Sequence, residues 1–288
     1  MQDRGELDWT NITFMAVAHA LAGLGVWWLL THFNYWTPAL GLIWFALCGL
    51  GITGGYHRLF AHRTYQAAGW LRLAYLLFGA ASVQSSAFSW ASKHRVHHRK
   101  VDGDEDPYNI NRGFWWAHFG WVLYKDADRG LYKIRDLQAD PLMVWQHRYY
   151  VPLAVAFGAL LPLALGLLWG DPWGALLVAG FLRLVLQYHA TFAINSLAHT
   201  LGDRPYDATT SARDHFVTAL VTLGEGYHNF HHTFQYDYRN GVRAWQFDPT
   251  KWLIGGLSYV GATRGLKRAP DKHIREARAA TTPRQPRV

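Results

Sequence analysis

Three clusters of histidine constrain this chain more than any other feature. The spacing His-x-x-His-His occurs twice, and a looser pair precedes both; the members are His57 and His62, then His94, His97 and His98, then His228, His231 and His232. Imidazole is the commonest nitrogen ligand of transition metals. Because residues three and four apart share a helix face, each triplet can converge on one point. Eight ligands exceed the roughly four to six that one ion takes, so the pattern predicts two metal ions close together.

A ninth ligand is predicted at His199, which follows Asn195 by one helical turn at the end of an apolar run. Asn195 is a weak ligand and is better suited to holding a metal-bound water. His57 and His62 are separated by about 140° on a regular α-helix, so this pair fits a helix end. The other histidines have no partner at ligand spacing and are interpreted as structural or surface residues: His19, His32, His118, His147, His189, His215 and His273.

The ligand set also bears on the kind of metal. Four ligands satisfy a tetrahedral zinc site, and sites rich in thiolate need cysteines. The chain has a single cysteine, Cys48, which excludes an internal disulfide, a cysteine-based metal site and an iron–sulfur cluster. A neutral, nitrogen-rich site for two metals therefore favours iron and oxygen chemistry.

Four apolar runs, each near the ~20 residues that a spanning helix needs, predict membrane crossings. They cover about residues 12–31, 36–56, 149–169 and 173–197. Residues 70–90 are also mostly apolar, but a crossing there would separate the first two histidine clusters, so this segment is expected to lie in the interface or to re-enter. The sequence predicts an all-α integral membrane protein, a single domain over residues 1–288 with four transmembrane helices, a histidine-bearing helical cap over 57–148 and 198–266, and a basic tail over 267–288 whose last part is disordered.

The distribution of Lys and Arg predicts the orientation. The two short turns between spans have neither residue, whereas the segments with the histidine clusters carry nearly all of them. The positive-inside rule then places the clusters and both termini of this multi-pass protein in the cytoplasm. The net charge of +8 fits an anionic membrane surface or acidic partners. No compact basic motif of a nucleic-acid reader occurs, so nucleic acid is not expected as a partner.

The residues around the clusters resemble the three histidine boxes of membrane acyl-CoA desaturases, the stearoyl-CoA or delta-9 group. The boxes are residues 57–62, 94–98 and 224–234, and further matches include Asp106-Pro107, Asn195-Ser196-Leu197-Ala198-His199 and Asp237-Tyr238-Arg239-Asn240-Gly241. The similarity runs from about Thr37 to Trp252. It implies a cytosolic di-iron centre with nine histidine ligands split unevenly between two irons, and Asn195 holding a water at the less-ligated iron. It also implies O2 as co-substrate and a bent tunnel that yields a cis double bond near mid-chain, at the delta-9 position, in a saturated C16–C18 acyl-CoA.

Five residues are candidates for contact with the substrate. Leu42 and Phe45 lie about three turns before His57 and are expected near the closed end of an acyl tunnel, together with Ala46. Trp90 and Arg95, beside the second cluster, are the other two. The chain departs from the family at Ser85-Ser86, where Asn-Asp is frequent, and at His189, where an uncharged polar residue is usual.

Desaturation needs two electrons per turnover, and the chain shows no haem motif, cysteine cluster or dinucleotide fingerprint. The expected partners are membrane lipid, the acyl-CoA substrate and a separate electron donor, either a ferredoxin or a cytochrome b5-type protein with its reductase. Basic residues of the cap suit both an acidic donor and the phosphates of CoA: Lys93, Arg95, Arg99, Lys100 and Arg112.

Three other functions compete with this interpretation. The substrate chain can be bound in a phospholipid instead of CoA. The same iron chemistry ends in a fatty acid or alkane hydroxylase if a hydroxyl group is returned to the chain. The last alternative is a histidine-rich membrane protein that binds metal without catalysis.

Overall fold

Four helices are long and apolar enough to cross a membrane. The computed structural model describes residues 5–125 and 134–281, and the spans are Trp9–Thr31, Trp36–Ala61, Tyr150–Trp169 and Pro172–His199. Each contains or closely matches a run predicted from the sequence, so the four-span, mainly helical fold class is confirmed. The end of the basic tail, residues 282–288, lies outside the described residues.

The disputed apolar segment does not form a spanning helix. Helix α3 (Gly69–Ala81) has 13 residues, which is too short for a bilayer core of about 30 Å. Residues 82–86 interrupt the segment, and α4 (Ala87–Lys100) then carries the second histidine cluster. This segment is therefore not a fifth candidate span, in agreement with the sequence prediction.

The described chain divides into two compact units. The first comprises residues 5–61, 69–95, 119–125 and 134–189, and the second comprises 62–68, 96–118 and 190–281. Two of the boundaries fall inside helices, in α4 and in α11 (Arg183–Ser196). The remaining elements of the first unit are α1 (Trp9–Thr31), α2 (Trp36–Leu50), η1 (Gly51–Ala61), η3 (Gly120–Leu123), α6 (Arg135–Gln138), α7 (Pro141–Arg148), α8 (Tyr150–Val155), η4 (Ala156–Leu160), α9 (Leu161–Gly166), η5 (Leu167–Trp169), α10 (Pro172–Ala175) and η6 (Leu176–Leu182).

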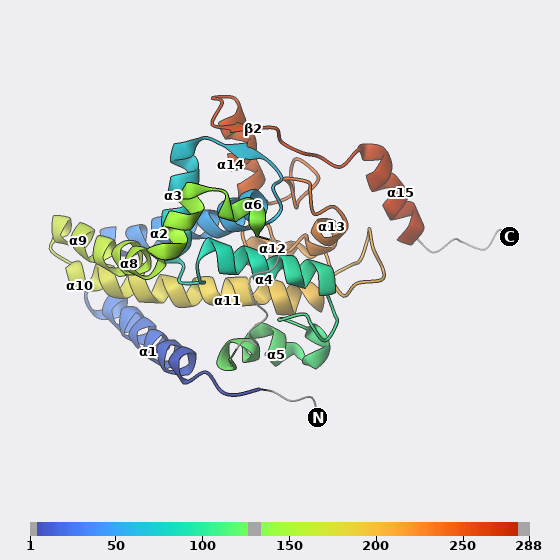
Figure 1. Ribbon diagram of the computed structural model, residues 1–288. Helices are drawn as coiled ribbons and strands as arrows, with labels where there is room; N and C mark the ends of the chain where they lie inside the picture. Colours follow the sequence, from blue (N-terminus) through green and yellow to red (C-terminus); the bar gives the residue numbers. More distant parts are fainter. Residues whose placement is uncertain (1–4, 126–133, 282–288) are drawn as a thin grey trace. The chain divides into compact units, whose positions relative to one another are not determined.

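The first unit is held by apolar packing between its spans. In Figure 1, α9 and α10 lie beside α2. A buried cluster joins Leu40, Trp44 and Cys48 of α2 to Ala81, Ala175 and Ala179, with Phe78 and Phe157 packed against it. Three segments, η1, η4 and η6, have the wider π-helical turn. Such turns are frequent at functional sites, and η1 contains His57 and ends directly before His62.

Asp171 ties the two short turns between spans together. It begins α10 as an N-cap, and its Oδ1 accepts hydrogen bonds from the Gly174 amide (3.0 Å) and Trp28 Nε1 (3.1 Å). Its Oδ2 accepts from Asn34 Nδ2 (2.8 Å) and Thr37 Oγ1 (2.5 Å). Since Asn34 lies in the first turn and Asp171 in the second, both turns lie at the same end of the first unit.

We expect Asp171→Ala to destabilise the protein by about 2–3 kcal/mol, because it removes a helix cap and leaves several donors unpaired. Thermal unfolding in detergent measures the loss. Asp8→Ala is the matched control: Asp8 caps α1 with one side-chain bond, to the Asn11 amide, so its loss should cost only about 1 kcal/mol. Equal effects of the two variants would contradict the role of Asp171.

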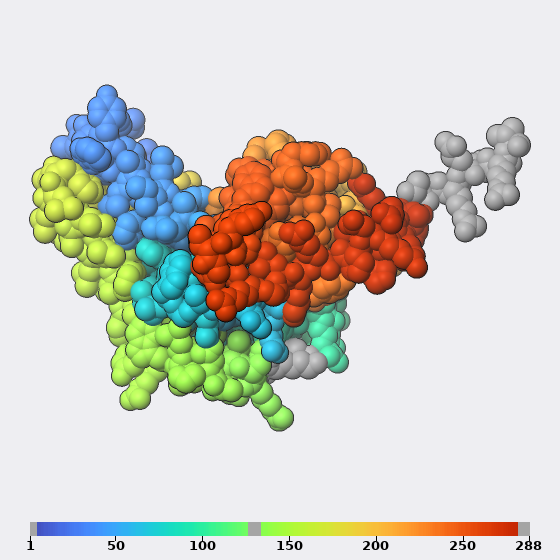
Figure 2. All heavy atoms as spheres, turned by 90° about the horizontal axis from the view of Figure 1, so that it is seen from above, coloured from blue at the N-terminus to red at the C-terminus, as the bar shows by residue number. Residues whose placement is uncertain are grey.

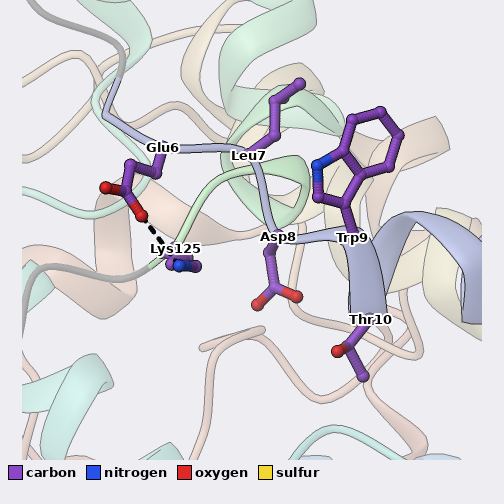
Figure 3. A pocket seen from close by; sticks show the side chains of 6 residues that line it. All are labelled: Glu6, Leu7, Asp8, Trp9, Thr10 and Lys125. Atoms are coloured by element: carbon purple, nitrogen blue, oxygen red, sulfur yellow. Dashed lines mark hydrogen bonds and ion pairs between the residues drawn. The ribbon is translucent and has the colours of Figure 1, made fainter.

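The start of the described chain is anchored to the segment before residue 126. Leu7 and Tyr124 form an antiparallel bridge, and Glu6 Oε2 forms an ion pair with Lys125 Nζ at 2.7 Å. Figure 3 shows this pair on the wall of a surface pocket, which is also lined by Asp8, Trp9 and Thr10. Both partners of the ion pair are exposed, so its contribution to stability is small.

The second unit is built from short helices and loops around the third histidine box. Its elements are β1 (Gln66–Ala67), η2 (Ile110–Arg112), α5 (Phe114–His118), η7 (Leu197–His199), α12 (Phe216–Val221), α13 (His228–Thr233), α14 (Pro249–Ser258), β2 (Thr263–Arg264) and α15 (Asp271–Thr281). Strands β1 and β2 pair antiparallel, with Gln66 opposite Arg264. The C-terminal part of this unit forms a continuous orange-to-red surface in Figure 2.

Helix α15 lies within the segment that the sequence analysis treated as a basic tail. Its residue Ile274 is buried against Tyr206, Phe230 and Phe234, and the Arg278 guanidinium lies 5.5 Å from the centroid of the Tyr206 ring. Little in the sequence indicates this helix, because few large apolar residues occur in this charged segment. The helix is held by tertiary packing, and it covers a side of α13, the helix that bears the third histidine cluster.

Candidate metal centre

Four buried histidines of the second unit form a compact set, here called the four-histidine cluster: His97, His199, His228 and His232. Their ligand atoms all lie within 4.8 Å of one another. They come from α4, η7 and α13, and residues 97 and 228 are distant in the sequence. The prediction that each triplet converges on one point is therefore wrong within this unit: His97 joins His228 and His232, whereas His98 joins His231. His199 lies with the first of these groups.

The two members on α13 face each other across one helical turn. His228 Nε2 and His232 Nε2 are 3.0 Å apart. Two nitrogens bound at right angles to one metal at ~2.1 Å would be separated by about 3 Å. Burial, reinforced by the neighbouring His98, His228, His97 and His199, holds the pKa of His232 well below its usual value. The imidazole is therefore neutral at physiological pH, which is the form that binds metals.

Asp106 orients His97 within the four-histidine cluster. The His97 Nδ1 atom lies 2.8 Å from Asp106 Oδ1, and the same carboxylate accepts from the amides of Tyr108 (3.0 Å) and Asp102 (3.2 Å). Burial alone would raise the pKa of Asp106, but His97 and the two amides outweigh it and lower the pKa below its ordinary value. An ionised Asp106 fixes the proton of His97 on Nδ1 and leaves Nε2 as the metal ligand, as in carboxylate–histidine–metal triads.

The two ring nitrogens of His199 are arranged as in His97, with Nδ1 in contact with the protein and Nε2 left for a metal. Its Nδ1 lies 2.6 Å from Ser211 Oγ, while its buried Nε2 has no hydrogen-bond partner within residues 5–125 and 134–281. A buried nitrogen without a partner costs free energy unless something else satisfies it. A metal ion bound by the four-histidine cluster would do so, and the donor set therefore fits a metal.

The second unit holds a further set, the three-histidine cluster: His62, His98 and His231. Their ligand atoms are also within 4.8 Å of one another. His231 Nε2 and His98 Nε2 are 2.9 Å apart, and the centroids of the His62 and His98 rings are separated by 4.5 Å. The separation of His231 Nε2 and His98 Nε2 again suits two ligands of one metal ion.

The last two predicted ligands, His57 and His94, lie in the first unit. Their ring centroids are 4.6 Å apart, and Trp90 stacks on His94 at 4.8 Å. His57 belongs to the π-helix η1, and His62 follows the end of that helix. His62 therefore lies just beyond a helix end, as the sequence predicted for this pair. Because a π-helix bonds residues five apart, the 140° offset of a regular α-helix does not apply to residues 57 and 62.

The approach to α13 is shaped by two glycines. Gly224 has φ +97°, a conformation that a side chain would strain, and a Cβ on Gly226 would lie 2.2 Å from the Ala219 nitrogen. These positions allow the chain to pass tightly behind α12 before the helix begins at His228. The first turn of α13 is then capped by a residue distant in the sequence. Asp214 Oδ1 accepts hydrogen bonds from the amides of Asn229 (2.8 Å) and Phe230 (3.1 Å).

Asp214 should make stability depend on pH. Burial, opposed by its two amide hydrogen bonds, raises its pKa to about 7. The folded protein then keeps a proton that the unfolded chain releases from about pH 4 upward, so this group lowers stability as pH rises from 4 to 7. Asp214→Asn retains the accepting oxygen without the charge, and should stabilise the protein at pH 8 by about 1–2 kcal/mol after solvent screening.

Unfolding temperatures measured from pH 5 to pH 8 test this. Asp214→Ala is the second variant, because it removes the cap itself and should destabilise the protein at both ends of the range. A pH slope in Asp214→Asn as steep as that of the unchanged protein would contradict the assignment.

The predicted substrate residues lie in different surroundings. Phe45 is half-buried in α2, whereas Leu42 is 73% exposed on the same helix. Trp90 is half-buried against the His94 ring. Arg95 is engaged by the protein, with both guanidinium ends on the Asp136 carboxylate at 2.9 Å and further bonds to the carbonyls of Ala61 and Phe60.

Asn195 and the remaining histidines complete the comparison with the sequence. Asn195 is half-buried on α11, one turn before His199. The histidines interpreted as structural do make structural contacts: His118 lies 2.8 Å from Ser196 Oγ, His147 lies 2.7 Å from Ser86 Oγ, and His19 lies 3.2 Å from His189. The sequence analysis missed Ser211, Asp102 and Asp214, because single polar residues in loops carry no spacing signal.

Comparisons with known proteins agree with this geometry. The family model described as fatty acid desaturase matches residues 33–259. The chain is 44% identical to a probable acyl-CoA desaturase of Schizosaccharomyces pombe over 94% of its length and 57% of that protein. It is 35% identical to stearoyl-CoA desaturase 5 of Bos taurus, covering 97% of this chain and 85% of that one. It is 38% identical to an sn-2 palmitoyl-lipid 9-desaturase of Nostoc, covering 92% of each. The chain thus spans little more than half of the yeast relative.

Proposed function

Because the chain belongs to the fatty acid desaturase family, we propose that it is an oxygen-dependent di-iron acyl-CoA desaturase. The proposed substrate is a saturated C16–C18 acyl-CoA, and the product carries a cis double bond near mid-chain, at the delta-9 position. The observation that carries the proposal is the buried four-histidine cluster, whose ligand atoms lie within 4.8 Å of one another in a chain with four candidate spans.

Two irons, held by the nine histidines with Asn195 beside the second, would supply the reduction of O2 and the removal of two hydrogens from the chain. The residues of the protein bind, orient and exclude water. Asp106 and Ser211 hold the Nδ1 protons of His97 and His199. Burial lowers the pKa of His232 and so favours the neutral, metal-binding form of this imidazole.

Orientation and partners extend the proposal. The two turns joined by Asp171 and Asn34 contain no Lys or Arg, so we place them outside and the histidine clusters and both termini in the cytoplasm. Exposed Arg99, together with Arg112, which lies 3.4 Å from the Trp116 ring centroid, offers positive charge to the phosphates of CoA or to an acidic donor. The donor would be a ferredoxin or a cytochrome b5-type protein with its reductase.

A direct test supplies purified, iron-loaded protein with stearoyl-CoA, O2 and a reduced donor, and locates new double bonds by mass spectrometry. We expect a cis double bond near mid-chain that forms only when the reductant is present. A hydroxylated chain, or turnover without any reductant, would overturn the proposal. Iron bound without turnover of any acyl substrate would favour a metal-binding protein.

One observation favours a second substrate class. The Nostoc relative, similar over 92% of both chains, is described as a lipid desaturase. A parallel reaction therefore offers the same acyl chain at the sn-2 position of a glycerolipid in vesicles. Faster turnover of the lipid than of the acyl-CoA would replace the CoA assignment and leave the desaturase chemistry in place.

Chain length offers a residue-level prediction. If half-buried Phe45 closes the acyl tunnel, Phe45→Ala should shift the preference toward longer chains by about tenfold, since a methylene in a hydrophobic pocket contributes roughly 1–3 kcal/mol. Competition between C16, C18 and C20 acyl-CoA measures the shift. Leu42→Ala is the matched control, because Leu42 is 73% exposed on the same helix. The same profile in both variants would exclude Phe45 from the tunnel.

A further inference from the structure

The hydrogen bonds of Ser211 determine the tautomer of His199. Ser211 Oγ lies within hydrogen-bonding distance of both Asp102 Oδ1 and His199 Nδ1 (2.6 Å to the latter). A hydroxyl has one proton, and a carboxylate only accepts. Ser211 must therefore donate to Asp102 and accept from His199 Nδ1–H. The lone pair of His199 is left on the buried Nε2, which has no hydrogen-bond partner within the described chain.

Asp102 is held firmly enough to serve this purpose. Its carboxylate also accepts the Ser211 amide at 2.7 Å, and its carbonyl accepts from Asn111 Nδ2 at 2.9 Å. Its backbone has φ +65°, a left-handed conformation that non-glycine residues rarely adopt and that aspartate tolerates better than most. Surrounding contacts must impose this conformation.

The same turn supports a second ligand. The Asp102 amide donates to Asp106 Oδ2 at 3.2 Å, and Asp106 Oδ1 lies 2.8 Å from His97 Nδ1. A continuous chain of hydrogen bonds thus runs from His97 through Asp106, Asp102 and Ser211 to His199. Both ends of the chain present Nε2 to the four-histidine cluster.

The loop that carries Ser211 is also fastened to α13. The side chain of Asn229, fully buried between two ligands of the third box, donates to the carbonyls of Ala212 (2.9 Å) and Asp207 (2.7 Å) and accepts the Tyr206 amide (2.8 Å). The position of Ser211 is therefore set relative to His228 and His232 as well. The contact between Ser211 and His199 is therefore a defined part of the structure around the four-histidine cluster.

We propose that Ser211 and Asp102 are positioning residues that hold His199 in the tautomer and orientation its metal requires. The inference rests on the proposed function only in taking the four-histidine cluster as a metal site. Outer partners of metal-bound histidines typically change metal affinity 10- to 100-fold when removed.

The test compares Ser211→Ala, Ser211→Thr and Thr209→Ala with the unchanged protein. Thr209 is the matched control, because its hydroxyl also bonds an aspartate, Asp207 at 2.6 Å, and within residues 5–125 and 134–281 it makes no hydrogen bond to a histidine. Metal-free full-length protein in detergent is titrated with Co²⁺, and the visible ligand-field spectrum and bound metal per chain are recorded. Unfolding of the metal-free proteins monitors the fold separately.

We expect Ser211→Ala to weaken one of two Co²⁺ equivalents 10- to 100-fold and to alter its spectrum, without changing metal-free stability by more than Thr209→Ala does. Ser211→Thr, which keeps the hydroxyl, should restore binding and the spectrum. Unaltered binding in Ser211→Ala, an equal loss in Thr209→Ala, or no rescue by threonine would overturn the inference. If the unchanged protein binds no Co²⁺ and no iron, the proposed metal centre fails instead, and the inference falls with it.

Discussion

Replacing His97, His199 or His231 with alanine is expected to reduce turnover by at least about a thousandfold and to lower bound iron. Each substitution removes a nitrogen that lies within 4.8 Å of the other candidate ligand atoms of its cluster. All three histidines are buried, so water has little access to replace the lost nitrogen. Iron per chain, determined by plasma emission spectrometry, and double-bond formation, determined by mass spectrometry, provide the two measurements.

Two controls make this prediction specific. His273→Ala removes an exposed imidazole on α15 and should leave iron content and turnover unchanged. Asn195→Ala should retain more iron than any ligand variant, because Asn195 is proposed to hold a water and not the metal itself. Full activity in His199→Ala would show that the ninth ligand has been assigned wrongly, even if the other eight were correct.

The sequence predicted the spans and the metal clusters for the same reason: both are periodic or continuous patterns. A run of about 20 apolar residues has few alternatives to a spanning helix, so the predicted run 36–56 reappears within Trp36–Ala61. The His-x-x-His-His spacing predicts that residues four apart share a face, as His228 and His232 do. It gave no indication that the adjacent His97 and His98 belong to different clusters. His199 could be included as a candidate ligand because it ends the fourth candidate span.

The rest depended on contacts between distant residues. Asp102 and Ser211 are 109 positions apart, and no local pattern in either segment indicates the other. The π-helical turn of η1 changes the angle around the helix axis between His57 and the residues that follow it. No spacing pattern in the sequence indicates such a turn. Leu42 and Phe45 have the same hydrophobic character in the sequence, yet the structure exposes one and half-buries the other.

The second large effect is expected at Asp106, whose carboxylate accepts the Nδ1 proton of His97. The Asp106 Oδ1 and His97 Nδ1 atoms are 2.8 Å apart. Asp106→Ala should weaken iron binding 10- to 100-fold, with a parallel loss of turnover. The variant leaves a buried N–H of His97 without its acceptor, and it frees the ring to take the other tautomer, which presents a protonated Nε2 to the metal. Iron retained during dialysis against a graded chelator series measures the change.

Asp106→Asn separates charge from shape at the same position. Asparagine can still accept from His97 through Oδ1, but it lacks the negative charge that stabilises the imidazole when a cation binds, so iron binding should fall by an intermediate amount. Asp104→Asn, an exposed carboxylate in the same turn, is the matched control and should bind iron normally. If Asp104→Asn lost as much iron as Asp106→Asn, the general negative potential of the turn would account for the effect, and the contact between Asp106 and His97 would not.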